Sequence, residues 1–195
     1  NAEDAMAILL KDAIKPNLVQ TLEGNPAIIH GGPFANIAQG TNTIVATKMG
    51  MSLSKYVITE AGFGADLGAE KFLDIKCQSA GLSPKAVVLT TTIRALKYHG
   101  GADLKNLTEE NVDALKNGLP NLEKHIENVR QFGITPVIAI NKFITDSDAE
   151  VAVIREFAKS QNIRVALAEV WAKGGKGALE LAQHVVDIVE EGSSK

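Results

Sequence analysis

Short apolar runs alternate along the chain with longer stretches in which apolar residues recur every three or four positions. The short runs are almost continuously apolar, which is typical of parallel strands covered by helices on both faces. We interpret as strands Leu18–Thr21, Ala27–Ile29, Tyr56–Thr59, Ala86–Thr91, Pro136–Asn141 and Arg164–Glu169. The longer stretches predict helices over 42–51, 67–77, 109–117, 121–131, 147–160 and 177–190, with a further helix-like stretch over 3–11. The pattern predicts an α/β fold with a mostly parallel sheet.

Capping residues agree with this reading of the chain. Thr145 or Asp146 is predicted to cap the helix over 147–160, and Gly133 lies where a C-cap glycine belongs. The segment 100–120 is the most polar and irregular, and we expect it to be a surface excursion.

Composition and charge narrow the function classes. Of the 195 residues, 45% are hydrophobic and 22% are charged, as in an ordinary globular protein. Because the net charge is −3 and no apolar run could span a bilayer, we expect neither nucleic acid nor a membrane as partner. The single cysteine, Cys77, cannot form an internal disulfide, which favours a reducing compartment, the cytoplasm. We interpret residues 3–195 as one α/β segment of a longer protein, with Asn1 and Ala2 as a candidate tag remnant.

A glycine-rich segment, residues 30–40, follows the second apolar run and carries His30, Phe34 and Asn36. Open α/β sheets bind ligands in the loops beyond the carboxyl ends of their strands. The segment therefore predicts a binding loop, and the alternative is a tight turn whose glycines only satisfy local geometry.

A second loop, Thr59–Gly68, places two carboxylates and an aromatic ring after an apolar run. Glu60 and Asp66 are candidates for contacts with Mg²⁺ or with water around phosphates. Phe63 stands between two glycines, a poor place for a core residue and a good one for stacking. The alternative for Asp66 is a helix cap.

Cations and exposed aromatics follow the remaining strands. Arg94 and Lys97 come after the strand that ends at residue 91, and they suit anionic oxygens or, alternatively, pair with surface acids. Phe143 and Trp171 each follow a separate strand, so both can project from one edge of the sheet. The turn after residue 140 is similar to the base-reading turn of GTPases, but Ile144 stands where that turn has aspartate. The Gly-x-x-x-x-Gly-Lys-Ser/Thr motif is absent from the sequence, so we expect a P-loop-NTPase-like architecture that lacks its phosphate loop.

Four long motifs carry a likeness to a known family. They are Lys-Pro-Asn-Leu-Val-Gln-Thr-Leu-Glu-Gly at 15–24, Gly-Gly-Pro-Phe-Ala-Asn-Ile-Ala at 31–38, Thr-Glu-Ala-Gly-Phe-Gly-Ala-Asp-Leu-Gly-Ala-Glu-Lys-Phe at 59–72 and Ile-Arg-Ala-Leu-Lys at 93–97. Together they closely resemble formate–tetrahydrofolate ligase, also called formyltetrahydrofolate synthetase. The likeness runs over essentially the whole chain, and it covers only the central part of that family's usual length.

The resemblance implies an ATP-dependent ligation of formate to N10 of tetrahydrofolate through formyl phosphate, with Mg²⁺ accompanying ATP. It implies that Phe143 and Trp171 sandwich the pterin and that Leu167 lies in the folate cleft. The residues that we place along the nucleotide and folate cleft are His30, Phe34, Asn36, Glu60, Phe63, Asp66, Arg94 and Lys97. The full-length protein is expected to be a homo-oligomer.

The chain departs from the family pattern at two places. Gln39 stands where the family usually has histidine, and Thr90–Thr91 stands where it usually has Val-Ala. Glutamine can keep a hydrogen bond but cannot titrate. In the family, the phosphate loop and the cations that handle formyl phosphate lie upstream of this segment. Beyond the candidate contacts of Glu60 and Asp66 with Mg²⁺ or its water, we therefore assign no catalytic residue and no metal site here. We expect the isolated chain to be inactive; the alternative is a non-catalytic domain for folate binding or assembly.

Overall fold

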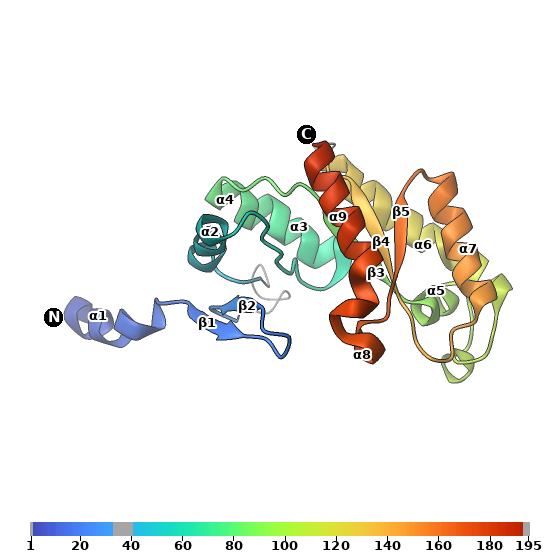
Figure 1. Ribbon diagram of the computed structural model, residues 1–195, viewed down its shortest axis with the longest axis horizontal. Coiled ribbons are helices and arrows are strands. Elements are labelled where there is room, and N and C mark those ends of the chain that lie inside the picture. The colour runs from blue at the N-terminus through green and yellow to red at the C-terminus, as the bar shows by residue number, and fades with distance from the viewer. Residues whose placement is uncertain (1, 33–40, 193–195) are drawn as a thin grey trace. The chain divides into compact units, whose positions relative to one another are not determined.

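The computed structural model describes residues 2–32 and 41–192 and divides the chain into two compact units, Asn1–Leu82 and Ser83–Lys195 (Figure 1). Three residues of the first glycine-rich segment, Phe34, Asn36 and Gln39, lie outside the described residues.

The first unit contains a β-hairpin between helices. Its elements are α1 (Ala2–Ala13), β1 (Asn17–Gln20), β2 (Pro26–Ile29) and α2 (Ile44–Leu53), followed by a helical segment over residues 64–80. Strands β1 and β2 pair antiparallel, with Asn17 opposite Ile29. The prediction that these two runs belong to a parallel sheet is wrong, because a link of five residues allows a hairpin but not a parallel crossover.

The apolar run at 56–59, predicted as a strand, forms none. Its central residue Ile58 is 90% exposed, so the run is not buried against the described part of the chain. The helix predicted over 67–77 is present and longer, but its hydrogen-bonding pattern changes along its length. It consists of the π-helical η1 (Gly64–Gly68), α3 (Ala69–Lys71), the π-helical η2 (Phe72–Cys77) and α4 (Gln78–Ala80).

The second unit is a three-stranded parallel sheet in the order β3–β4–β5. The strands are β3 (Val87–Thr91), β4 (Pro136–Asn141) and β5 (Arg164–Ala168), close to the predicted ranges. The helical elements are α5 (Ile93–His99), η3 (Leu104–Asn106), α6 (Val112–Gln131), α7 (Asp148–Ser160), α8 (Val170–Lys173), η4 (Gly174–Ala178) and α9 (Leu179–Glu191). The predicted α/β class is confirmed.

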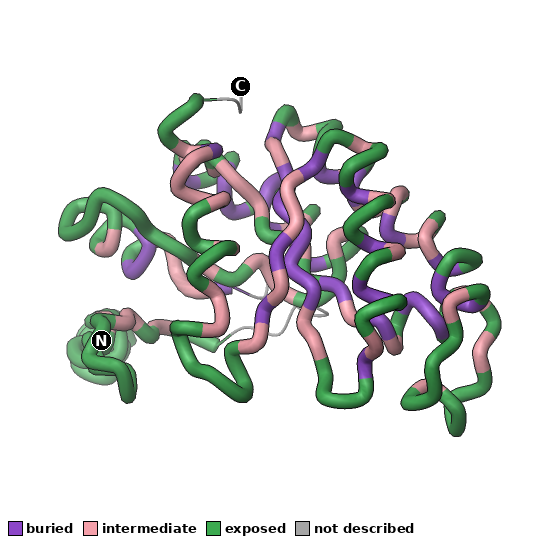
Figure 2. The backbone as a smooth tube through the Cα atoms, turned by 45° about the vertical axis from the view of Figure 1, so that its right-hand side comes forward, coloured by how far each residue is buried: buried purple, intermediate pink, exposed green. Residues whose placement is uncertain are grey.

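The central strand β4 explains why helices cover both faces of this sheet. Its Ile138 and Ile140 belong to one buried cluster with residues of α5, α6 and α7. Val137 and Ala139 alternate with them, point to the other face and are equally buried. On that face α9 contacts β4 and β5. Figure 1 shows α9 on one side of the strands and α6 and α7 on the other. Five of the six residues of β4 are buried, and Figure 2 shows such a run of buried backbone through this unit.

Helices α5 and α6 pack backbone against backbone through two glycines. A Cβ added at Gly100 would overlap the carbonyl of Ala114, and one at Gly118 would overlap the carbonyl of Leu96. The segment 100–120 is therefore only partly a surface excursion, because its second half lies in α6. The two helices predicted over 109–117 and 121–131 form this one helix, which contains Pro120. Tertiary packing of its buried face outweighs the hydrogen bond that proline removes.

The start of α7 is set by a capping box. Ser147, and not Thr145 or Asp146 as predicted, is the N-cap: its Oγ accepts from the backbone N–H of Glu150, and the Glu150 carboxylate accepts from the backbone N–H of Ser147. The predicted C-cap glycine is present, since Gly133 adopts a positive φ of 72° after α6.

A buried ion pair connects α5 to α7. The Lys97 ammonium donates to Glu150 Oε1 at 2.8 Å and to the backbone carbonyl of Glu109 at 2.7 Å, and both side chains of the pair are fully buried. Glu150 Oε1 also accepts from the backbone N–H of Asn111 at 3.0 Å. The prediction that Lys97 lines a cleft is wrong, because the side chain is fully buried and its ammonium binds the carboxylate of Glu150.

Replacing Lys97 with methionine should destabilise the protein by about 3–5 kcal/mol, because the substitution leaves the Glu150 carboxylate buried without its cation. Urea unfolding followed by circular dichroism measures this. The matched control is Lys124→Met, which removes an exposed pair with Glu127 at 2.9 Å and should leave the unfolding curve unchanged. Equal curves for the two variants would contradict a structural role for the buried pair.

Acid should weaken the same connection. Burial alone would raise the pKa of the Glu150 carboxyl, but hydrogen bonds from Lys97, Asn111 and Ser147 outweigh it and hold the pKa below the ordinary 4.5. A group whose pKa is lower in the folded state stabilises that state above its unfolded pKa and loses this contribution as the pH falls through the folded pKa. The free energy of unfolding should therefore fall below about pH 4.5, more steeply in the unaltered chain than in Glu150→Gln. Parallel pH curves for the two proteins would show that Glu150 does not contribute.

Candidate functional site

The carboxyl ends of β3, β4 and β5 meet at one edge of the parallel sheet. The chain leaves β3 at Thr92, which caps α5 by accepting from the backbone N–H of Ala95 at 3.1 Å. It leaves β4 into the turn 142–147 and leaves β5 into the short helix α8. Ligands of open α/β sheets bind at this edge, and several of the predicted site residues lie here.

The turn after β4 presents Phe143 and holds its backbone rigidly. The backbone N–H of Phe143 donates to Asp146 Oδ2 at 2.8 Å, and the backbone N–H of Asp146 donates to the Phe143 carbonyl at 3.1 Å. Asp146 is itself buried, and its Oδ1 has no hydrogen-bond partner among the described residues. Phe143 remains 38% exposed. A buried carboxylate, that of Asp146, thus holds the backbone of Phe143 in place.

Arg94, in the first turn of α5, reaches this same turn. Its guanidinium carbon lies 4.2 Å from the centroid of the Phe143 ring, and its Nη2 donates to Thr145 Oγ1 at 3.0 Å. The structure therefore brings together two of the predicted site residues, which come from different strand ends.

Trp171 follows β5, the strand next to β4, and is 94% exposed. It lies in α8, a single helical turn. The backbone around it is anchored: the N–H of Glu169 donates to the Gly177 carbonyl at 3.0 Å, and Lys173 Nζ donates to Glu169 Oε2 at 2.6 Å. An indole with so much exposed surface on an anchored turn is available for stacking.

Leu167 lies on β5, opposite Ile140 of β4 in the strand register. It is half-buried and packs against the main core cluster. Its position near the carboxyl end of the strand leaves part of the side chain open, so its predicted role in the folate cleft stays a prediction.

In the first unit, His30 and Glu60 line one small hollow of about 160 Å³ together with Gly31, Gly32 and Asn42. His30 Nε2 lies 2.8 Å from the Ala13 carbonyl, which can only accept, so this nitrogen carries the proton. Nδ1 lies 2.8 Å from Thr43 Oγ1 and accepts from that hydroxyl when the ring is neutral. Both ring nitrogens are occupied, so His30 shapes the hollow and has no free nitrogen to offer a ligand in this arrangement.

The loop before the helical segment exposes Phe63. Gly62 and Gly64 on either side of it have positive φ angles of 80° and 75°, and the ring is 90% exposed. Gly68 packs directly on this loop, because a Cβ there would lie 2.5 Å from the carbonyl carbon of Gly62. Asp66 is exposed in the first turn of η1. The ring of Phe63 is therefore exposed on a glycine-flanked loop and not part of a core, as the sequence predicted.

Sequence reasoning missed Lys76, which is 1% exposed and lies in the π-helical η2. Its ammonium lies 5.3 Å from the centroid of the Phe72 ring and has no hydrogen-bond partner among the described residues. Burial lowers the pKa of Lys76, and the nearby Cys77 and Glu60 partly offset this. The clearest signal in the sequence was its place on the apolar stripe of a helix. Cys77 is buried, and burial raises the pKa of its thiol, which makes it a poor nucleophile.

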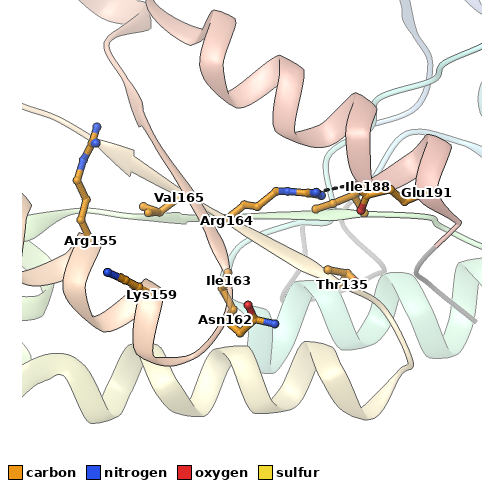
Figure 3. A pocket seen from close by; sticks show the side chains of 9 residues that line it. All are labelled: Thr135, Arg155, Lys159, Asn162, Ile163, Arg164, Val165, Ile188 and Glu191. Carbon is orange, nitrogen blue, oxygen red and sulfur yellow. Dashed lines mark hydrogen bonds and ion pairs between the residues drawn. The ribbon is translucent and has the colours of Figure 1, made fainter.

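A larger hollow, about 470 Å³, lies at the opposite, amino-terminal edge of the sheet (Figure 3). Its cations include Lys159 and Arg164, and Arg164 forms an ion pair with Glu191 at 2.5 Å. Helices α7 and α9 end here, and cations at helix C-termini compensate the negative end of the helix dipole. These charges are explained without a ligand, so the carboxyl edge remains the candidate site.

Within residues 2–32 and 41–192, no group of three or more His, Cys, Asp or Glu side chains is arranged to hold a metal ion. In the same ranges, no helix has both the length and the apolar character needed to cross a membrane.

Comparison with known proteins accounts for the whole chain. The family model for formate–tetrahydrofolate ligase matches residues 1–195. The chain is 58% identical over 192 residues to formate–tetrahydrofolate ligase of Staphylococcus aureus strain NCTC 8325, and equally so to that of strain Newman. These alignments cover 98% of this chain and 35% of each relative, so the chain spans about a third of the length of the curated relatives it matches. The chain belongs to the formate–tetrahydrofolate ligase family.

Proposed function

We propose that this chain supplies the folate-binding edge of a formate–tetrahydrofolate ligase. The observation that supports this best is the pair of exposed aromatic side chains, Phe143 and Trp171, at the ends of two adjacent parallel strands. A pterin is a flat heterocycle, and two rings presented from one sheet edge can stack on it from both sides. Leu167, half-buried at the same end of β5, would contact the ligand beside the rings.

The reaction that we propose for the whole protein is the ATP-dependent formylation of tetrahydrofolate at N10 through formyl phosphate. Mg²⁺ bound with ATP would neutralise the phosphate charge. In this chain the carboxylates that suit hydrated Mg²⁺ are Glu60 and Asp66, both exposed in the first unit. Glu60 would contact the hydrated Mg²⁺ from the hollow that it lines with His30, and Asp66 would do so from the first turn of η1.

The chain's own residues would bind and orient substrates. Phosphoryl transfer requires a cradle of backbone N–H groups and cations around the phosphates. The sequence contains no Gly-x-x-x-x-Gly-Lys-Ser/Thr loop, and the predicted cation Lys97 is bound to Glu150. We therefore propose that the isolated chain binds folate without catalysing the ligation. The cytoplasmic location, the homo-oligomeric state and the P-loop-NTPase-like architecture stay predictions.

Titration with tetrahydrofolate should quench the fluorescence of Trp171, the only tryptophan of the chain. Phe143→Ala should weaken binding about tenfold, as expected for the loss of one stacking partner. Calorimetry gives the affinity independently of the fluorophore. The control is Leu104→Ala, which removes an exposed apolar side chain from η3 and should bind like the unaltered chain. Quenching that is absent, or unchanged in Phe143→Ala, would contradict the proposed platform.

Incubation of the isolated chain with formate, MgATP and tetrahydrofolate should give no formyltetrahydrofolate and no ADP, whereas a full-length ligase from a relative, assayed in parallel, should give both. The reason is the missing phosphate cradle, since binding of the acceptor alone leaves the phosphoryl transfer uncatalysed. Formation of product by this chain would overturn that part of the proposal. Folate binding without any dependence on ATP would be consistent with a purely binding domain.

A further inference from the structure

We infer that Arg94 is a positioning residue for the pterin platform, acting through the ring of Phe143. This inference rests on the proposed function, since it concerns the same aromatic pair. Arg94 covers one face of the ring, so that a ligand meets the other face of a ring that is already held in place.

Arg94 contacts both the ring of Phe143 and a neighbouring residue of the same turn. The guanidinium carbon lies 4.2 Å from the ring centroid, within the range of a cation–π contact. On the same turn, Nη2 donates to Thr145 Oγ1 at 3.0 Å. The guanidinium is therefore fixed by a hydrogen bond on one side and lies against the ring on the other.

This arrangement supplies what the backbone of the turn cannot. Asp146 Oδ2 accepts from the backbone N–H of Phe143 and so fixes the Cα, but the ring could still rotate about its side-chain bonds. Ordering a side chain when a ligand binds lowers the affinity, and a ring that is ordered beforehand avoids this cost. The half-buried Arg94 and the 38% exposure of Phe143 fit a ring with one covered and one open face.

The planar guanidinium is suited to this task. Arg94 Nε is buried and has no hydrogen-bond partner among the described residues, so this part of the group is not held by an acceptor there. A guanidinium stacks on aromatic faces, whereas an ammonium is a compact charge that is more strongly hydrated. Lysine at this position would keep the charge and lose the flat contact.

The test is a double-mutant cycle on the 195-residue chain, with tetrahydrofolate affinity measured by calorimetry and stability by thermal unfolding. Arg94→Gln should weaken binding about fivefold, and Arg94→Lys should fall between it and the unaltered chain. In the Phe143→Ala background, Arg94→Gln should cause no further loss, because the ring through which it acts is gone. The control is Arg155→Gln, which changes an arginine at the amino-terminal edge of the sheet and should bind normally.

Each outcome decides the inference. Unchanged affinity in Arg94→Gln, with Phe143→Ala still weakened, would overturn the role of Arg94 and leave the proposed function standing. Equal losses in both backgrounds would also overturn it, since Arg94 would then contact the ligand directly or act only on the fold. Absence of tetrahydrofolate binding by the unaltered chain would overturn the proposed function and this inference together. If Arg94→Gln fails to fold, the same cycle with Arg94→Lys decides the matter.

Discussion

The buried ion pair between Lys97 and Glu150 determines the geometry of the carboxyl edge in the second unit. The pair fixes α5 against the first turn of α7, and the two other hydrogen bonds of the carboxylate hold the N–H groups at the starts of α6 and α7. Arg94 lies one turn before Lys97 on α5. The turn that leads into α7 carries Phe143. Because α5 is held against α7, Arg94 is held against this turn. An interaction with no exposed atoms thus sets the position of exposed ones.

The arrangement also explains why this edge can remain open. Burying two charges is costly, and the cost is recovered only where each remaining lone pair and proton is satisfied. Glu150 accepts from one ammonium and two backbone N–H groups, so both of its oxygens have a donor, and the ammonium also donates to the Glu109 carbonyl. The carboxyl edge is then stabilised by buried groups, namely the hydrogen bonds of this ion pair and the apolar core cluster. Phe143 and Trp171 lie outside the buried cluster, and the exposed part of each side chain is available to a ligand.

The pattern of apolar residues was sufficient to predict an element wherever burial alone determines which residues form it. The range of β4 is as predicted, because a central strand covered on both faces reads as a continuous apolar run. Strands β1 and β2 were located well but assigned to the wrong sheet, since their apolar content does not distinguish a hairpin from a crossover. The role of Lys97 could not be read from its neighbours, because its carboxylate partner is 53 positions away. For the same reason a sequence places Arg94 near anions, although its aromatic contact is set by packing across a comparable separation.

The candidate site residues do not share one physical environment, and this limits what each can contribute. His30 is occupied at both nitrogens, Lys97 is buried in an ion pair, and Phe63 and Trp171 are almost fully exposed. Exposed rings bind by stacking, which is sensitive to how well the ring is ordered before the ligand arrives. Of the aromatic residues at the carboxyl edge, Phe143 is the one with a cation on its face and a carboxylate on its backbone. Trp171 depends instead on the anchoring of a single helical turn. We therefore expect the two sides of the platform to differ in character, with Phe143 as the fixed side and Trp171 as the side that adapts to the ligand.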